Sequence, residues 1–431
     1  MKMRWMTAGH SEKHWHNFRK GLWKMKKLKS KLLTLGLVGI LTLSSALAGC
    51  GQNPQDNNPQ QDAADVVGSE ENNQQETAVE IGSKEDFAKL YDDLSASYIL
   101  TADIDFGGDA MNPVGIFEPK SDAEEDAETP NTALAFTGTF DGNGHTLSNI
   151  KIDAADKNGV GLFGCVTGEG SWIKNLKVEN ISVKGGNYTG GVIGFADFGS
   201  YVEGITLDGK NTVEGKFLIG GIAGASHADI VDCEAVADLT LTDANMQGAG
   251  IIVGGQEDGN LENCTASGTI TAPDGCYSIG GLAGCFHCSE YAKNCKAENI
   301  KIVTGDNCWL LGGLAGHSGT FENDPTLVEN GIVKNVSIET GRNSERIGGI
   351  TGGGFYSPLY KEYYPEPAKS DIKSCTVSEF TVSGGKYVGA AVGYSYGTTS
   401  VDGFDGQMTW DGSESKEQVG ADESVKLEEL K

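Results

Sequence analysis

Proline, basic residues and long hydrophobic runs are all scarce in this chain of 431 residues. It has 10 prolines, which excludes collagen, because collagen needs much proline besides glycine at every third position. The 33 lysines and arginines are outnumbered by 60 acids, and the net charge of −27 argues against a nucleic-acid or anionic-lipid partner. The apolar run 32–46 is too short for a comfortable membrane span. No HExxH motif occurs, which argues against a zincin peptidase.

The N-terminal region has the features of an export signal. Lysines at positions 26, 27, 29 and 31 precede the apolar run, and Leu47-Ala48-Gly49-Cys50 follows it. These last four residues resemble the lipobox of bacterial lipoproteins. The resemblance implies cleavage before Cys50 and lipidation of its thiol, which would anchor the protein at the extracellular face of the bacterial membrane. We therefore predict a lipoprotein signal peptide over 1–49, with Met25 as the translation start; the alternative is an ordinary signal peptide with a chance cysteine.

The segment that follows the signal is polar. Residues 50–79 are rich in Gln, Asn, Asp, Glu and Pro and have too few large apolar side chains to bury a core, so they are predicted to be a disordered tether. Residues 1–49 hold 10 of the bases and one of the acids, so their removal leaves 23 bases and 59 acids, a net charge of −36.

Glycine is abundant, with 62 residues, and much of it recurs at a fixed spacing. The repeated pattern is Gly-Gly, an aliphatic residue, a small residue and Gly, as in Gly220-Gly221-Ile222-Ala223-Gly224. A period of about 30 residues is typical of stacked repeat architectures. The glycines are expected to serve corners with positive φ or close backbone approach. The closing glycines lie at 164, 194, 224, 254, 284, 316, 352 and 393.

Alternating apolar and polar residues between the glycine motifs indicate strands with one buried face. They follow a second recurring pattern, seen for example in Lys174-Asn175-Leu176, Glu262-Asn263-Cys264 and Lys334-Asn335-Val336. We therefore predict an all-β chain folded as a β-solenoid of about eight rungs. The aliphatic motif position should form an inward column, made of Leu162, Val192, Ile222, Ile252, Leu282, Leu314 and Ile350.

These glycine motifs closely resemble the GLUG repeat of bacterial surface and adhesion-type proteins, and Gly281-Leu282-Ala283-Gly284 fits its core literally. Similar repeats accompany the N-terminal regions of IgA peptidases. The resemblance implies a right-handed parallel β-helix over 151–400, preceded by an N-terminal capping module over 80–150. Residues 401–431 are then a C-terminal cap and acidic tail. Ser83 is a candidate N-cap for a helix over 84–94 that would close one end.

The nine cysteines after Cys50 fall at shared repeat positions. Cys233, Cys264, Cys295 and Cys375 share one position, and Cys276 and Cys308 share another. We favour stacked small core residues over a disulfide framework.

Metal ligation is a weaker hypothesis. Cys285, His287, Cys288 and His317 could approach one another across two rungs and bind Zn²⁺ or Cu⁺, but their spacing is not that of a zinc finger. We predict no metal and no cofactor. Asp103, Asp105 and Asp109 could form a Ca²⁺ site, although turn and edge positions are the preferred interpretation.

Two insertions lengthen the later repeats, over about 318–329 and 355–365. Both follow the same motif position, so both should project from one corner. The second contains Tyr356, Tyr360, Tyr363 and Tyr364, and a tyrosine-rich loop suits contact with a carbohydrate or a protein. The alternative is a loop that folds its rings onto the flank of the solenoid.

The favoured function is that of a cell-surface lipoprotein for adhesion or recognition, without catalysis. Its partners would be the membrane through Cys50, and a glycan or a host or bacterial surface protein, but not nucleic acid. One alternative is a glycan-active β-helix enzyme, a polysaccharide lyase or hydrolase. Against it, no carboxylate pair can be nominated, and residues 50–431 contain only two arginines, Arg342 and Arg346. A structural surface spacer is the other alternative.

Overall fold

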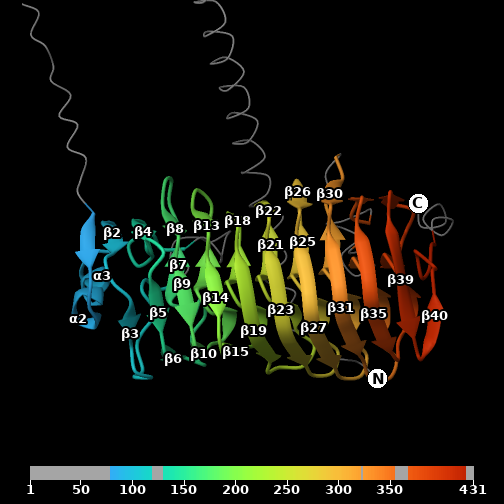
Figure 1. The fold of residues 1–431 in the computed structure, drawn as a ribbon, viewed down its shortest axis with the longest axis horizontal. Coiled ribbons are helices and arrows are strands. Elements are labelled where there is room, and N and C mark those ends of the chain that lie inside the picture. Colours follow the sequence, from blue (N-terminus) through green and yellow to red (C-terminus); the bar gives the residue numbers. More distant parts are fainter. Residues whose placement is uncertain (1–77, 119–129, 322–323, 355–366, 424–431) are drawn as a thin grey trace, which may run out of the picture. The chain divides into compact units, whose positions relative to one another are not determined.

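The computed structural model describes residues 78–118, 130–321, 324–354 and 367–423. The predicted signal peptide, Cys50, most of the tether and the four loop tyrosines lie outside these ranges. The described residues form a nearly all-β solenoid with four long parallel sheets (Figure 1). The predicted parallel β-helix is therefore confirmed.

Each turn of the chain, here called a coil, visits the four sheets in a constant order. One coil runs through β17 (Ala223–Ser226), β18 (Asp229–Val231), β19 (Glu234–Leu241) and β20 (Gln247–Gly250). The next coil begins with β21 (Val253–Glu257), which pairs in parallel with β17. The four strands belong to the eight-, eleven-, fourteen- and seven-stranded sheets respectively.

Two sheets meet at the glycine motif. The eight-stranded sheet has one strand beginning in each motif, which confirms the predicted eight rungs, here called coils. Its strands are β7 (Phe163–Val166), β12 (Ile193–Ala196), β17, β21, β25 (Ala283–His287), β29 (Ala315–Gly319), β33 (Thr351–Gly353) and β37 (Val392–Tyr394). The seven-stranded sheet lies just before the motifs and comprises β11 (Asn187–Gly190), β16 (Phe217–Gly220), β20, β24 (Tyr277–Gly280), β28 (Trp309–Gly312), β32 (Glu345–Gly348) and β36 (Lys386–Gly389).

The other two sheets are longer. The eleven-stranded sheet comprises β1 (Val79–Ile81), β2 (Ser97–Leu100), β4 (Thr139–Asp141), β8 (Trp172–Lys174), β13 (Tyr201–Glu203), β18, β22 (Leu261–Glu262), β26 (Tyr291–Lys293), β30 (Thr326–Glu329), β34 (Ser370–Lys373) and β38 (Thr399–Asp402). The fourteen-stranded sheet comprises β3 (Ile104–Asp105), β5 (Thr146–Ser148), β6 (Lys151–Asp153), β9 (Lys177–Glu179), β10 (Ser182–Lys184), β14 (Thr206–Asp208), β15 (Thr212–Gly215), β19, β23 (Thr265–Ala272), β27 (Lys296–Thr304), β31 (Ile332–Glu339), β35 (Thr376–Ser383), β39 (Asp405–Trp410) and β40 (Ser413–Ser415).

The glycine motif forms the bend between the seven- and eight-stranded sheets. Strand β16 ends at Gly220, the bend is Gly221-Ile222, and β17 begins at Ala223. A Cβ at Gly224 would lie 2.5 Å from the backbone nitrogen of Thr189. None of these glycines has a positive φ. Close backbone approach therefore explains the motif, and the expected positive-φ corners are not at these positions.

Positive φ occurs instead at the second residue of strands in the seven-stranded sheet. Leu218, Leu310 and Arg346 have φ of 48°, 57° and 63°. Such values are unusual for bulky residues. The strands pair on either side of Leu218: Phe217 pairs with Asn187 of the preceding coil, and Ile219 pairs with Thr189. Each is therefore a local break in the extended backbone that recurs from coil to coil without shifting the register.

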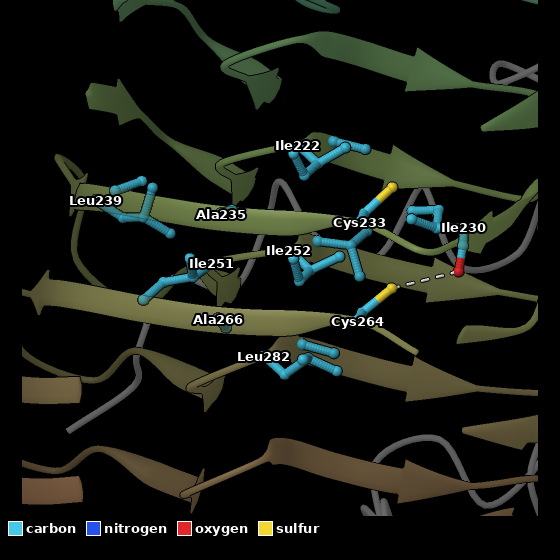
Figure 2. Packing of buried hydrophobic residues seen from close by; sticks show 14 of the residues in the cluster. Ile222, Ile230, Cys233, Ala235, Leu239, Ile251, Ile252, Cys264, Ala266 and Leu282 are labelled. Atoms are coloured by element: carbon cyan, nitrogen blue, oxygen red, sulfur yellow. Dashed lines mark hydrogen bonds between the residues drawn. The ribbon is translucent and has the colours of Figure 1, made fainter. Parts of the chain in front are cut away.

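The interior of the coils is aliphatic and includes stacked cysteines (Figure 2). All seven members of the predicted inward column are at most 1% exposed. Cys233 and Cys264 stack in neighbouring coils beside Ile222 and Ile252. No disulfide joins the nine cysteines of the described residues, and all nine are buried. The prediction that they are core residues is confirmed by this burial.

Asparagines form the corner between the eleven- and fourteen-stranded sheets. Asn263, Asn294 and Asn330 all have φ near 55°, a conformation that asparagine tolerates. Their side chains form a hydrogen-bonded ladder, in which Asn330 Nδ2 donates to Asn294 Oδ1 at 3.1 Å and Asn294 Nδ2 to Asn263 Oδ1 at 3.1 Å. The sequence pattern predicts Asn335 at this corner, and that prediction is wrong. Lys293 pairs with Glu329, so Asn330 is the residue that follows Asn294 in the ladder.

The N-terminal end is closed by two short helices, α2 (Lys84–Phe87) and α3 (Lys89–Asp92). They replace the single predicted helix over 84–94. The predicted N-cap is confirmed, since Ser83 Oγ accepts a hydrogen bond from Asp86 N at 3.0 Å. Phe87 and Leu90 are buried, and the Phe87 ring packs on Phe140 of the first coils. The helices thereby cover apolar side chains at the end of the sheets.

Candidate functional site

The outer face of the eleven-stranded sheet carries a row of half-buried side chains that lie in register. The middle residue of each strand, such as Ile173 or Val202, points into the core and is fully buried. The residue before it points outward. We call this outer row the aromatic column: Trp172, Tyr201, Asp229, Asn260, Tyr291 and Leu327.

A second outer row, two residues further along each strand, alternates in charge. Lys174 Nζ lies 3.0 Å from Glu203 Oε2, and Lys293 Nζ lies 3.9 Å from Glu329 Oε2. We call this row the charged column: Asp141, Lys174, Glu203, Val231, Glu262, Lys293, Glu329, Lys373 and Asp402. Opposite charges in neighbouring coils thus neutralise much of the face locally.

The two columns hold each other in place. Lys174 Nζ lies 5.2 Å from the ring centre of Trp172 and 4.8 Å from that of Tyr201. Lys293 Nζ lies 4.5 Å from the ring of Tyr291. Burial and the nearby carboxylate of Glu203 raise the pKa of Tyr201, so its hydroxyl stays protonated at neutral pH. The face therefore presents neutral, oriented rings.

Sequence reasoning missed this face. A usable signal exists, because an aromatic residue, an aliphatic one and a charged one precede the corner in Trp172-Ile173-Lys174, Tyr201-Val202-Glu203 and Tyr291-Ala292-Lys293. Extending the asparagine pattern back by two residues reveals it.

Both insertions leave from the same corner, which confirms that prediction. Thr320, after β29, pairs with Lys369, before β34, and each backbone nitrogen donates to the other's carbonyl oxygen. This corner connects the eight-stranded to the eleven-stranded sheet, next to the aromatic column. The described ends of the tyrosine-rich segment, Gly354 and Pro367, lie at this connection.

The structure brings His287 and His317 into ring contact, with centroids 5.7 Å apart, and pairs Cys285 with His317 in neighbouring strands, but it does not assemble the four residues into the predicted weak metal site. Cys285 packs in a small apolar cluster with Leu218 and Phe195, and burial raises the pKa of its thiol. His317 Nδ1 lies 2.8 Å from Ser278 Oγ, and Cys288 Sγ accepts from Thr320 Oγ1. Within the described ranges no group of three or more His, Cys, Asp or Glu side chains could hold a metal ion.

His287 belongs instead to a row of carboxylates and imidazoles at this corner. Its Nδ1 lies 3.7 Å from Glu257 Oε1, and His227 Nδ1 lies 3.9 Å from Asp258 Oδ2. These four side chains are only 5–17% exposed. Burial lowers the pKa of His227, but Asp258 and Asp197 outweigh it and leave that pKa raised. Such buried pairs suit a structural, pH-sensitive corner better than acid–base catalysis on a polymer.

Acid should destabilise the fold through His317. Burial, with the charge of His287, holds the pKa of His317 well below its usual range. The unfolded chain therefore binds this proton more readily, and stability is lost as pH falls below about 6.5. For one proton the expected slope is about 1.4 kcal/mol per pH unit. Urea unfolding between about pH 5 and 7 should show a smaller change of unfolding free energy per pH unit for His317→Gln than for the unmodified protein. The surface variant His145→Gln should keep the slope of the unmodified protein. An unchanged slope in His317→Gln would contradict this assignment.

The acidic residues considered for Ca²⁺ act as turn acceptors. Asp103 Oδ1 accepts from Thr146 N at 2.9 Å, and Asp105 Oδ1 accepts from Gly107 N at 2.8 Å. Asp109 pairs with Lys84 at 2.6 Å. Hydrogen bonds lower the pKa of each carboxyl: from Thr146 for Asp103, from Asn149 and then Gly107 for Asp105, and from Lys84 for Asp109. The preferred interpretation as turn and edge residues is confirmed.

Comparisons with known proteins agree with the repeat pattern. The family model of the GLUG motif matches residues 248–271, from β20 into β23. Halomucin of Haloquadratum walsbyi is 36% identical over 172 residues, which is 38% of this chain and 2% of halomucin. This chain therefore matches only a small part of that protein's length.

A similarity to a solved structure is weaker. A candidate immunoglobulin A1 protease from Bacteroides ovatus has a TM-score of 0.37 and 16% identity, covering 79% of this chain and 80% of that one. Because this similarity is low, the fold assignment rests on the strand pairing described above. The chain therefore carries the GLUG motif, matched at residues 248–271 and recurring in eight stacked coils of a parallel β-helix.

Proposed function

We propose that this chain is a cell-surface recognition module that binds its ligand without catalysis. The carrying observation is the aromatic column, whose rings lie half-exposed on one sheet face with lysines packed against them. Aromatic side chains fixed in this way offer contact area at low entropic cost. The GLUG motif and the similarity to a protein named halomucin support a surface location.

The N-terminal region supplies the proposed anchor. Lipidation of Cys50 would attach the chain to the extracellular face of the membrane, and residues 50–79 would let the solenoid stand away from it. No helix in the described part of the chain is long and apolar enough to span a membrane. Mass spectrometry of the membrane-extracted protein tests the anchor through the lipid mass on Cys50.

The tyrosine-rich segment should contribute to binding, since it leads into β34, the strand that pairs with the strand of Leu327 at the end of the aromatic column. We expect the simultaneous replacement of Tyr356, Tyr360, Tyr363 and Tyr364 by alanine to abolish binding to surface glycans or proteins on an array, without lowering the melting temperature. Tyr277→Ala, on the seven-stranded sheet, is the matched control and should bind normally. Unchanged array binding by the quadruple variant would refute a role for the segment.

Two alternatives predict different surfaces. A glycan-cleaving enzyme needs an acid and a base that reach the substrate, whereas Glu257, Asp258 and their histidine partners are largely buried. A spacer has no need of half-exposed aromatic rings at matching positions in several coils, because such rings are costly unless used or packed. The recognition function accounts for them.

A further inference from the structure

We infer that the aromatic column binds a neutral polysaccharide, with the polymer lying along the coil axis and crossing the strands. This inference rests on the recognition function proposed above and names its ligand class. Three features of the face lead to it: the direction of the column, the polar groups within it and the balance of charge beside it.

The direction of the column fits an extended polymer. Trp172, Tyr201 and Tyr291 occupy the same position in their strands, so they line up from coil to coil. Four strand spacings separate Trp172 from Tyr291, roughly 19 Å at 4.8 Å each. A ligand that contacts both rings must therefore be long, and must run across the strands.

The polar centre of the column is fixed and accepts hydrogen bonds. Asp229 Oδ1 accepts from Asn260 N at 2.8 Å, and Asn260 Oδ1 accepts from Tyr291 N at 2.9 Å. A carboxylate has about four acceptor positions, so Asp229 retains capacity for further donors. Sugar hydroxyls supply such donors, while the apolar faces of the sugar rings pack on aromatic rings. Aromatic ends and a carboxylate centre therefore match a polyhydroxylated chain.

The charge balance selects a neutral polymer over an anionic one. The chain carries a net charge of −27, which repels polyanions. Lys174 and Lys293, the cations nearest the rings, are already paired with Glu203 and Glu329. A carboxylated or sulfated glycan would find no surplus positive charge at these two positions. A neutral glycan meets no such penalty.

Isothermal titration of the full chain tests the inference with a fixed series of polymers. Neutral glucans, mannans and galactans are compared with polygalacturonate and heparan sulfate, at about 50 and 500 mM NaCl. We expect at least one neutral polymer to bind, with an affinity that changes less than about twofold with salt, because no ion pair forms. Trp172→Ala should weaken binding by roughly tenfold or more, whereas Trp172→Phe and Tyr277→Ala should retain it.

The outcomes separate the ligand class from the function. Binding confined to anionic polymers, or weakened tenfold by salt, overturns the neutral class. Capture of a protein instead of any glycan, in a manner lost with Trp172→Ala, also overturns it but leaves the recognition face standing. Glycan binding that survives Trp172→Ala in a folded variant overturns both. Failure of every polymer to bind likewise overturns the glycan inference.

Discussion

Replacing Gly224 by valine should lower the free energy of unfolding by about 3 kcal/mol or more. A Cβ at this position would lie 2.5 Å from both Thr189 N and Tyr188 C, and 2.7 Å from Gly194 O. All three are backbone atoms of other strands, so no side chain can move aside to relieve the contact. The bend between the seven- and eight-stranded sheets would have to open. Urea unfolding followed by circular dichroism measures the loss.

Gly331→Ala is the matched control for this effect. A Cβ there would meet the side-chain atoms Leu314 Cδ2 at 3.1 Å and Cys375 Sγ at 3.2 Å, and Gly331 has no positive φ. The change should stay within about 1 kcal/mol. If Gly224→Val were as mild as Gly331→Ala, close backbone approach would not be what the motif glycines provide.

The coil could be predicted from the sequence because glycine spacing and strand alternation are local signals. Gly224 and Ile222 recur with their neighbours at a nearly fixed period, and stacking then follows from the need to bury the aliphatic position. The cysteine stack followed from the same period. Its one gap, at Gly331 between Cys295 and Cys375, did not, because Lys334-Asn335-Val336 repeats the corner pattern five residues beyond the true corner at Glu329-Asn330-Gly331.

The candidate site was less accessible to sequence reasoning. The glycine motifs fix which residues are buried, but recognition residues lie on the outer faces, where composition varies freely. Trp172 and Tyr201 become neighbours only when corners of different length are closed. His287 illustrates the converse, since its spacing suggested a metal ligand while its strand partner is Glu257. In both cases the pairing between strands of neighbouring coils decides which side chains become neighbours.

The second large effect concerns the aromatic column itself. Replacing Trp172, Tyr201 and Tyr291 together by alanine should reduce ligand affinity by about 100-fold or more, if each ring contributes roughly 1 to 2 kcal/mol. The three side chains are half-exposed and lie outside the aliphatic core. The fold should therefore survive, with a melting temperature close to that of the unmodified protein.

The most direct test of the account is the affinity of this folded triple variant for the surface ligand of the unmodified chain, measured beside Tyr277→Ala. We predict a loss of about 100-fold in the triple variant and a change of less than about threefold in Tyr277→Ala. A triple variant that is folded and binds as tightly as the unmodified chain would contradict the assignment of the eleven-stranded sheet as the recognition surface.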